Sequence, residues 1–362
     1  MGAGGLSREE VAEVRAFLRL ETLPGLGGRA IRSLVDKHGS GRGALAAATA
    51  QGRLWDDPEE EPDLASWQRS GMDVVPMTSS RYPRSLLALT DPPPLLFLKG
   101  QTGLLTPPAV AVVGSRRATE TGRRVAEILG RRLARAGVKV VSGMALGIDG
   151  AAHRGALGVG GHTLAVLGCG LGVVHPPSHR ALSRRIASMG LLVSEFLPQE
   201  PPRPFHFPRR NRIIAALADA VIVVEAGEKS GALITVEHAL DLGRDVLVVP
   251  GSVENPQCRG SNALLRDGAR VILDPETVME EFPEVGRLGA AGWGGTPGDA
   301  DALPDLPPEL RTVWAALSRE AAPVEDVALR ASLAPEEALA ALSLLELEGL
   351  VIQRPGLRFQ RS

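Results

Sequence analysis

The chain has 362 residues, of which 44% are hydrophobic and 23% charged, and its formal net charge is −2. This composition is typical of a soluble globular protein with roughly two or three domains and excludes a disordered chain. The sequence has no run of eighteen apolar residues, its start lacks the apolar stretch of a secretory signal, and its two cysteines, Cys169 and Cys258, are too few for a disulfide scaffold or a cysteine-rich zinc site. We therefore expect a cytoplasmic protein without a membrane partner.

Residues 1–72 are predicted to form a small helical domain. Apolar residues recur at helical spacing over residues 6–20 and 30–38. The glycine-rich stretch between them, residues 23–28, resembles the turn of a helix-hairpin-helix motif, whose backbone N–H groups can hold a phosphate. A plain loop that joins two helices explains the same residues equally well.

Residues 73–275 are predicted to form an α/β domain with a doubly wound, mostly parallel sheet. An extended, proline-rich lead-in over residues 75–106 precedes seven short apolar runs, at residues 109–113, 138–141, 163–167, 191–193, 220–224, 245–249 and 270–273. Continuous apolar runs are typical of strands buried on both faces, and helical stretches such as residues 121–136 and 232–242 separate them. In such sheets ligands bind beyond the carboxyl ends of the strands.

Residues 276–304 lack periodicity and are predicted to be a linker, and residues 305–362 are predicted to form a winged-helix domain. Three helices fit this domain, at residues 308–317, 324–331 and 335–348, and a short basic ribbon follows at residues 351–361. The third helix would face a DNA groove, yet it has four glutamates and no lysine or arginine. Because phosphates repel such a helix, we expect this domain to contact protein or to modulate a dimer.

Positive charge gathers in the sheet domain although the whole chain is slightly acidic. Residues 107–275 contain 21 Lys and Arg against 14 Asp and Glu, and residues 305–362 contain 6 against 9. This asymmetry indicates a localised anionic partner. Only four of the 40 basic residues are lysines, so arginine abundance reflects composition and only arginine clustering is informative.

The turn after the first strand of the parallel sheet is a candidate phosphate cradle. Glycine permits a tight turn and close approach, arginine offers a bidentate fork, and a helix N-terminus follows. The candidates are Gly114, Ser115, Arg116 and Arg117. An ordinary strand-to-helix turn with surface arginines is the alternative.

A dinucleotide site is disfavoured at this turn. Only one glycine of the G-x-G-x-x-G fingerprint is present, and the next strand ends at residues 141–144 without the acid that would hold a ribose. Asp149, which follows that strand, is expected to cap the next helix. His153 within that helix is expected to be structural.

The densest basic cluster is at residues 205–212. It combines three arginines within four residues and two phenylalanines, with no acid among them, in a chain that is only 3% aromatic. Cations that follow a backbone, beside rings on which bases stack, are typical of single-stranded nucleic-acid sites. The candidates are Phe207, Arg209, Arg210, Asn211 and Arg212. The alternative is a surface loop whose phenylalanines anchor it in the core.

A second helix start that suits an anion is at Lys229, Ser230 and Gly231. Lys229 is one of the few lysines, although a serine that merely caps the helix is the alternative for Ser230. The sequence contains no P-loop, G-x-S-x-G or H-E-x-x-H motif, and its seven histidines match no metal spacing. We therefore expect a binding protein with no catalytic residues, no metal and no cofactor.

The chain resembles the DNA-processing protein A (DprA, also called Smf) family of bacterial natural transformation over most of residues 80–275. The motifs that carry the resemblance are Gly114-Ser115-Arg116, residues 142–149 with His153, residues 207–212, Ser230-Gly231 with Thr235, residues 249–251, and residues 260–262 with Gly268-Ala269.

The resemblance implies an extended Rossmann-like domain that binds single-stranded DNA, forms a homodimer, protects incoming DNA and loads the recombinase RecA onto it. It also implies a SAM-like helical domain before the sheet and a winged helix after it. Its DNA-binding region would include Ser115, Arg116, Arg209, Arg210, Asn211, Arg212, Ser230 and Gly231. The loop at residues 170–179 departs from the G-x-D-x-x-Y-P-x-x-N pattern of the family, so no contacts are transferred to it.

An enzyme remains the alternative, namely a nucleotide-binding phosphoribohydrolase of the lysine-decarboxylase-like Rossmann class. Those enzymes place Thr and Glu after a glycine-rich helix start. Gly231, Thr235 and Glu237 match this order loosely, and the tandem Pro-Gly-Gly is missing.

Overall fold

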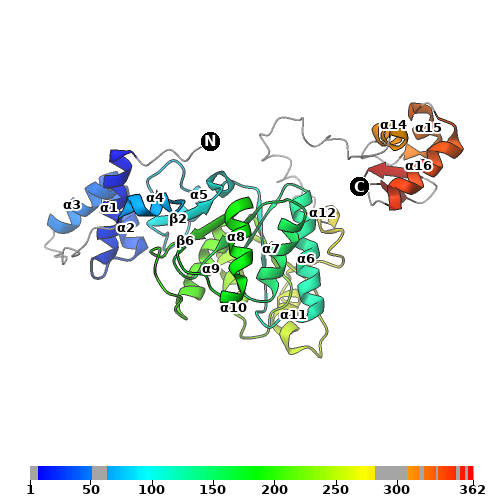
Figure 1. The fold of residues 1–362 in the computed structure, drawn as a ribbon. Coiled ribbons are helices and arrows are strands. Elements are labelled where there is room, and N and C mark those ends of the chain that lie inside the picture. The colour runs from blue at the N-terminus through cyan, green and yellow to red at the C-terminus, as the bar shows by residue number, and fades with distance from the viewer. Residues whose placement is uncertain are drawn as a thin grey trace. The chain divides into compact units, whose positions relative to one another are not determined.

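The computed structural model describes residues 7–50, 63–281, 308–317, 322–331, 333–347, 351–354 and 358–361. Contacts divide the chain into two compact units, Met1–Trp293 and Gly294–Ser362. The first unit holds the helical region and the sheet together (Figure 1). Within the described ranges, no helix combines the length and the apolar character that crossing a bilayer requires.

The N-terminal region is helical, as predicted. It contains α1 (Arg8–Thr22), α2 (Gly28–His38) and α3 (Gly41–Ala50), and α4 (Leu64–Arg69) leads into the sheet. A capping box starts α1, because the Ser7 hydroxyl accepts from Glu10 N at 3.2 Å and Ser7 N donates to the Glu10 carboxylate at 2.8 Å.

The first unit is built on a mostly parallel sheet. Its strand order is β1-β2-β6-β5-β4-β3-β7-β8-β9. Strand β2 is antiparallel to both of its neighbours, β1 and β6, and all the other neighbouring strands pair in parallel. Each of the seven predicted runs forms a strand whose bounds agree within two residues, which confirms the doubly wound α/β prediction. The strands are β1 (Met72–Pro76), β2 (Leu95–Gly100), β3 (Ala109–Val113), β4 (Lys139–Ser142), β5 (Thr163–Val166), β6 (Leu191–Ser194), β7 (Ala220–Val223), β8 (Asp245–Val248) and β9 (Arg270–Val271).

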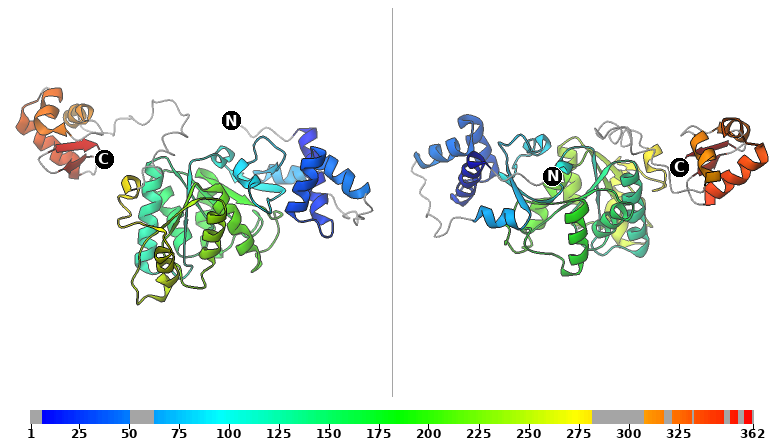
Figure 2. Two further views of the ribbon diagram at one scale, coloured as in Figure 1. Left: turned by 180° about the vertical axis from the view of Figure 1, so that it is seen from behind. Right: turned by 45° about the horizontal axis from the view of Figure 1, so that its top comes forward.

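Helices cover both faces of the sheet (Figure 2). Side chains alternate along β3: Val110 and Val112 pack with α6 and α7, whereas Ala111 and Val113 pack with α9 and α10. The helices of this unit beyond α4 are α5 (Arg84–Leu87), α6 (Glu120–Arg135), α7 (Ile148–Gly158), α8 (Arg180–Met189), α9 (His206–Leu217), α10 (Gly231–Asp241), α11 (Arg259–Arg266) and α12 (Val278–Glu281).

Two local predictions, and one interpretation that was left as an alternative, need correction. The lead-in at residues 75–106 is not wholly extended, because a short helix, α5, begins after Pro83. Residues 206–212 begin helix α9 instead of forming a loop, since a proline within the first turn lacks only an N–H that has no acceptor there. The predicted linker overlaps α12, and its residues 282–304 lie outside the described ranges.

The second unit has the predicted winged-helix outline. Its helices are α14 (Pro308–Ala316), α15 (Val324–Ala331) and α16 (Pro335–Leu347). The ribbon strands β11 (Val351–Arg354) and β12 (Arg358–Arg361) pair with the two-residue β10 (Ala322–Pro323) in the order β10-β12-β11. So short a strand carries no periodic signal, which explains why the sequence did not indicate it.

Candidate nucleic-acid interface

A cleft of about 700 Å³ opens at the carboxyl ends of β3 and β7. These neighbouring strands lead into α6 and α10 on opposite faces of the sheet, which is the switch point where such folds bind ligands. Ten of the twelve predicted site residues line this cleft: Gly114, Ser115, Arg116, Arg117, Phe207, Arg210, Asn211, Lys229, Ser230 and Gly231. Arg209 and Arg212 do not.

Three exposed cations stand along the cleft: Arg116, Arg117 and Lys229. Within the described part of the chain, none of the three forms an ion pair with a carboxylate. The Arg116 guanidinium lies 4.7 Å from the ring centroid of Phe207, a cation–π contact that orients both side chains. These cations are therefore available to an external anion.

Arg210 forms the floor of the cleft and is only 3% exposed. Its Nη1 donates to Gly143 O at 2.8 Å and also to Val166 O, and its Nε donates to the Asn211 side-chain oxygen at 3.2 Å. Burial lowers the pKa of Arg210 to about 10, so the side chain stays charged at neutral pH. Arg210 thus contributes a fixed positive charge beneath the cleft.

The start of α6 is closed to an external phosphate. The buried Glu225 carboxylate accepts from Thr119 N at 2.9 Å and from the Thr119 hydroxyl at 2.5 Å, so an internal anion occupies this helix N-terminus. Ser115 anchors the preceding loop, because its hydroxyl donates to Gln257 at 2.6 Å and accepts from Arg117 N at 3.0 Å. The predicted cradle therefore offers arginine side chains rather than backbone amides.

The start of α10 opens on the cleft. Ser230 caps this helix, and its hydroxyl accepts from Ala232 N at 3.3 Å. Ser230, Gly231 and Ala232 all line the cleft. The positive end of a helix therefore faces the same space as the exposed cations.

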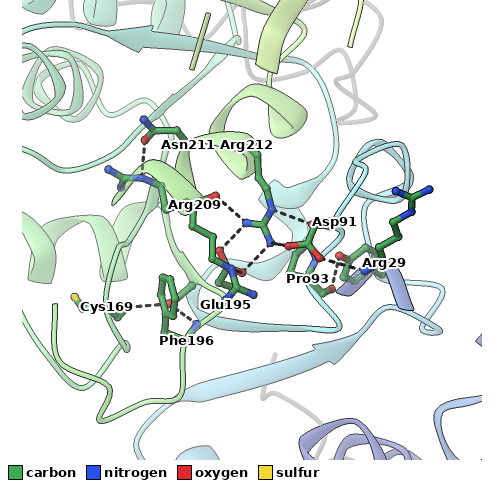
Figure 3. A network of polar contacts seen from close by, with 12 residues as sticks. Arg29, Asp91, Pro93, Cys169, Glu195, Phe196, Arg209, Asn211 and Arg212 are labelled. Atoms are coloured by element: carbon green, nitrogen blue, oxygen red, sulfur yellow. Dashed lines mark hydrogen bonds and ion pairs between the residues drawn. The ribbon is translucent and has the colours of Figure 1, made fainter. Parts of the chain in front are cut away.

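Arg212 is tied to the protein interior. Its Nη1 and Nη2 donate to the two oxygens of Glu195 at 2.6 and 2.8 Å, and its Nε donates to Asp91 O at 2.9 Å (Figure 3). Arg209 also pairs with Glu195, at 3.0 Å. The acid missing from the sequence around the cluster is thus supplied in space by the end of β6.

The start of α2, next to the glycine-rich turn, is also engaged internally, which favours the plain loop between two helices over a phosphate site. The Asp91 carboxylate accepts from Arg29 N in the first turn of α2 at 3.1 Å, and it lies 3.7 Å from Arg212 Nη2. A Cβ on Gly28 would overlap the Asp91 carboxylate and Pro92 O, so glycine permits this close approach. The N-terminus of α2 therefore docks the helical region onto the sheet.

Asp149 and His153 both lie within α7 and occupy structural positions. Asp149 lies inside the helix instead of capping it, and its carboxylate accepts from Gly143 N at 3.1 Å and Ala145 N at 3.3 Å. His153 is fully buried and its Nδ1 lies 2.7 Å from the Thr163 hydroxyl, which agrees with the structural role expected for it. Burial and the neighbouring His179 lower the pKa of His153 to about 3.

Three residues that organise the site were not singled out from the sequence: Glu195, Glu225 and Gln257. Glu195 directly follows the buried strand β6 and Glu225 lies two residues beyond the end of β7, and an acid at the carboxyl end of such a strand is a signal that could have been used. Gln257 stands in a short 3₁₀ turn without any pattern, so only the fold reveals its contact with Ser115.

Comparison with known proteins assigns the family. Residues 73–283 match the family described as DNA recombination-mediator protein A. The chain belongs to this family. Residues 297–356 match the DprA winged helix domain, so the resemblance found in the sequence is confirmed over both units.

Several members of this family are similar to the chain over most of their own length. Protein Smf of Escherichia coli K12 is 39% identical over 303 residues, which cover 82% of this chain and 79% of that protein. A crystal structure of DprA from Streptococcus pneumoniae matches with a TM-score of 0.61 at 32% identity and covers 77% of this chain and 99% of its own. The DprA structure from Helicobacter pylori, described for its single-stranded DNA binding mode, matches with a TM-score of 0.54 at 31% identity over 59% of this chain and 96% of its own.

Proposed function

We propose that this protein binds single-stranded DNA in the cleft at β3 and β7, without sequence preference and without catalysis. The observation that carries the proposal is the set of exposed cations, Arg116, Arg117 and Lys229, which line one cleft and have no carboxylate partner among the residues that the structure describes. The H. pylori relative, whose structure is described in terms of single-stranded DNA binding, supports the same function.

Phosphates and bases would contact different parts of the cleft. Arg116, Arg117, Lys229 and the start of α10 neutralise phosphates, while the buried Arg210 adds positive potential beneath them. Phe207, half-buried beneath Arg116, presents an apolar surface to bases. Because every base has an apolar face, such binding tolerates any sequence.

A salt titration tests this function. Single-stranded DNA affinity should fall with salt at a log–log slope of about −0.7 per neutralised phosphate, and Arg116→Ala should flatten the slope by roughly one contact. Arg135→Ala is the matched control, since this exposed arginine is the last residue of α6 and the cleft lies at the other end of that helix. Equal slopes for wild type, Arg116→Ala, Arg117→Ala and Arg135→Ala would remove the cleft from the function.

The proposal includes a homodimer that delivers the protected strand to RecA, as the resemblance implies. Exposed apolar side chains in and just after the edge strand β9 support pairing with a second copy: Val271 and Leu273. Two clefts on one strand would also raise avidity. Analytical sedimentation tests the dimer. The rate of RecA filament formation on strands coated with single-strand-binding protein tests delivery, and a rate that this protein does not increase would contradict it.

The winged helix has a separate role in this proposal, which is to contact protein or to modulate the dimer. The solvent face of α16 carries Glu336, Glu337, Leu339 and Leu344, a combination that suits protein better than phosphates. Duplex DNA binding by residues 305–362 alone at moderate salt would contradict this assignment.

The phosphoribohydrolase alternative loses support from the cleft. Thr235 lines it, but Glu237 is exposed and is not among the described residues that do. Asp149 is the one carboxylate among those residues, and it is engaged by two backbone amides. If the protein releases free base from nucleoside monophosphates and Glu237→Ala abolishes this activity, the phosphoribohydrolase alternative would be supported again.

A further inference from the structure

Phe205 is an exposed aromatic side chain next to the cleft at β3 and β7. Its exposed fraction is 61%, whereas every other Phe, Tyr and Trp that the structure describes is buried or half-buried. A single exposed phenylalanine is common on protein surfaces, so its position and its support decide whether it has a role.

The position of Phe205 is the rim of the cleft. Pro204 before it and Phe207 after it both line the cleft, whereas Phe205 itself does not. Phe205 is also the N-cap residue of α9, the helix that brings Phe207 and Arg210 to the cleft. A strand that left the cleft over Pro204 would therefore meet the Phe205 ring next.

Buried rings support Phe205 from below. The His206 ring is roughly perpendicular to the Phe205 ring, with the two centroids 4.7 Å apart, and it stacks on Phe196 with the centroids 4.0 Å apart. His206 and Phe196 are 4% and 7% exposed. The Arg209 guanidinium lies 5.9 Å from the Phe196 centroid (Figure 3). Contacts of this kind favour one arrangement of the rings, so Phe205 is held in place although most of it faces solvent.

The backbone around Phe205 is fixed as well. His206 N donates to Arg203 O at 3.0 Å, and Arg209 N donates to Phe205 O at 3.4 Å. Three of the four residues before Phe205 are prolines, at positions 201, 202 and 204, and proline restricts the chain. A ring that is already immobile loses little conformational entropy when a ligand stacks on it.

We propose that Phe205 is a second stacking platform, which receives a base of single-stranded DNA where the strand leaves the cleft. This inference rests on the proposed function. A flat apolar ring suits any base, because every base has a flat face of its own. The arginines on either side in sequence already have partners, since Arg203 pairs with Glu200 at 3.1 Å and Arg209 with Glu195 at 3.0 Å. Phe205 should therefore act on a base and add nothing to phosphate binding.

The charge state of the supporting ring agrees with an uncharged platform. Burial lowers the pKa of His206 from its ordinary 6.5, so the imidazole is neutral at pH 7. Stacking on this set of rings should consequently change the affinity for DNA without changing its dependence on salt.

The test uses fluorescence anisotropy on the full chain with two labelled strands, an oligothymidine and a strand of equal length that has abasic sites throughout. Phe205→Ala should weaken oligothymidine binding at least about fivefold and leave the salt slope and the abasic strand unaffected. Phe205→Leu keeps an apolar side chain against His206 but lacks the flat ring, so it should also weaken binding, whereas Phe205→Trp should retain it. Leu240→Ala is the matched control and should bind like the wild type, because Leu240 is 59% exposed near the end of α10, away from the cleft.

Arg116→Ala is measured alongside, because a phosphate contact should weaken binding of both strands. If Arg116→Ala weakens oligothymidine binding while Phe205→Ala and Phe205→Leu bind like the wild type, the platform is refuted and the proposed function stands. If none of the three variants differs from the wild type, both proposals fail. An equal loss on the abasic strand for Phe205→Ala would also overturn the inference, because the ring would then not act through a base.

Discussion

Replacement of Arg212 separates a structural arginine from Arg116, which we propose to bind DNA. The Glu195 side chain is 2% exposed and the Arg212 side chain 7%, and two short hydrogen bonds join them. Arg212→Ala would leave a buried carboxylate with Arg209 as its remaining cation, whose side chain is 45% exposed. Breaking a buried pair on one side costs about 3–5 kcal/mol, and the remaining Arg209 contact favours the lower end, about 3 kcal/mol.

Urea unfolding followed by circular dichroism measures this loss, and salt-titrated filter binding is carried out where the variants are folded. Arg212→Ala should keep the salt slope of the wild type, whereas Arg116→Ala should flatten the slope and change stability by less than about 0.5 kcal/mol. Glu195→Gln combined with Arg212→Met should recover part of the lost stability, because no buried charge is then left uncompensated. A loss below about 1 kcal/mol for Arg212→Ala, or a flattened salt slope in that variant, would refute the assignment of Arg212 to the fold.

Two further perturbations address the loops around the cleft. Gly147 has φ +80°, and a Cβ there would overlap Ser115 O, so Gly147→Ala should lower the free energy of unfolding in urea by more than about 2 kcal/mol and weaken DNA binding. Gly231→Ala is the control, because a Cβ there meets no atom and stability should be unchanged. Equal losses of stability in the two variants would contradict the reasoning. Burial holds the pKa of His153 near 3, below its ordinary 6.5, so between pH 6.5 and 3 the unfolded chain takes up a proton that the folded chain refuses. From pH 7 to pH 5 the wild type should therefore lose about 2 kcal/mol more than His153→Gln, and parallel losses would show that His153 does not titrate in this way.

Much of the fold could be predicted from local pattern alone. A parallel strand buried on both faces must be apolar at every position, so runs such as residues 109–113 and 220–224 identify themselves. The position of the cleft follows from topology, because β3 and β7 lead to helices on opposite faces. The strand prediction needs no side-chain contacts, which explains why it succeeded.

The use of each polar group could not be predicted in the same way, because it depends on partners that are distant in sequence. Thr119 and Glu225 are 106 residues apart, yet their contact decides that the start of α6 is closed to an external anion. Arg29 and Asp91 are 62 residues apart, and their contact closes the helical hairpin. A helix start is an anion site only when no internal carboxylate reaches it first.

The arginine cluster illustrates how secondary structure sorts identical side chains. Once residues 206–217 form a helix, positions three and four apart share a face. Phe207, Arg210 and Ile214 therefore line the cleft together, whereas Arg209 and Arg212 share another face and meet Glu195. The sequence presents three equivalent arginines within four residues, but a helical turn of about 100° per residue separates them. One charge lies beneath the cleft, and two fasten the helix that carries it.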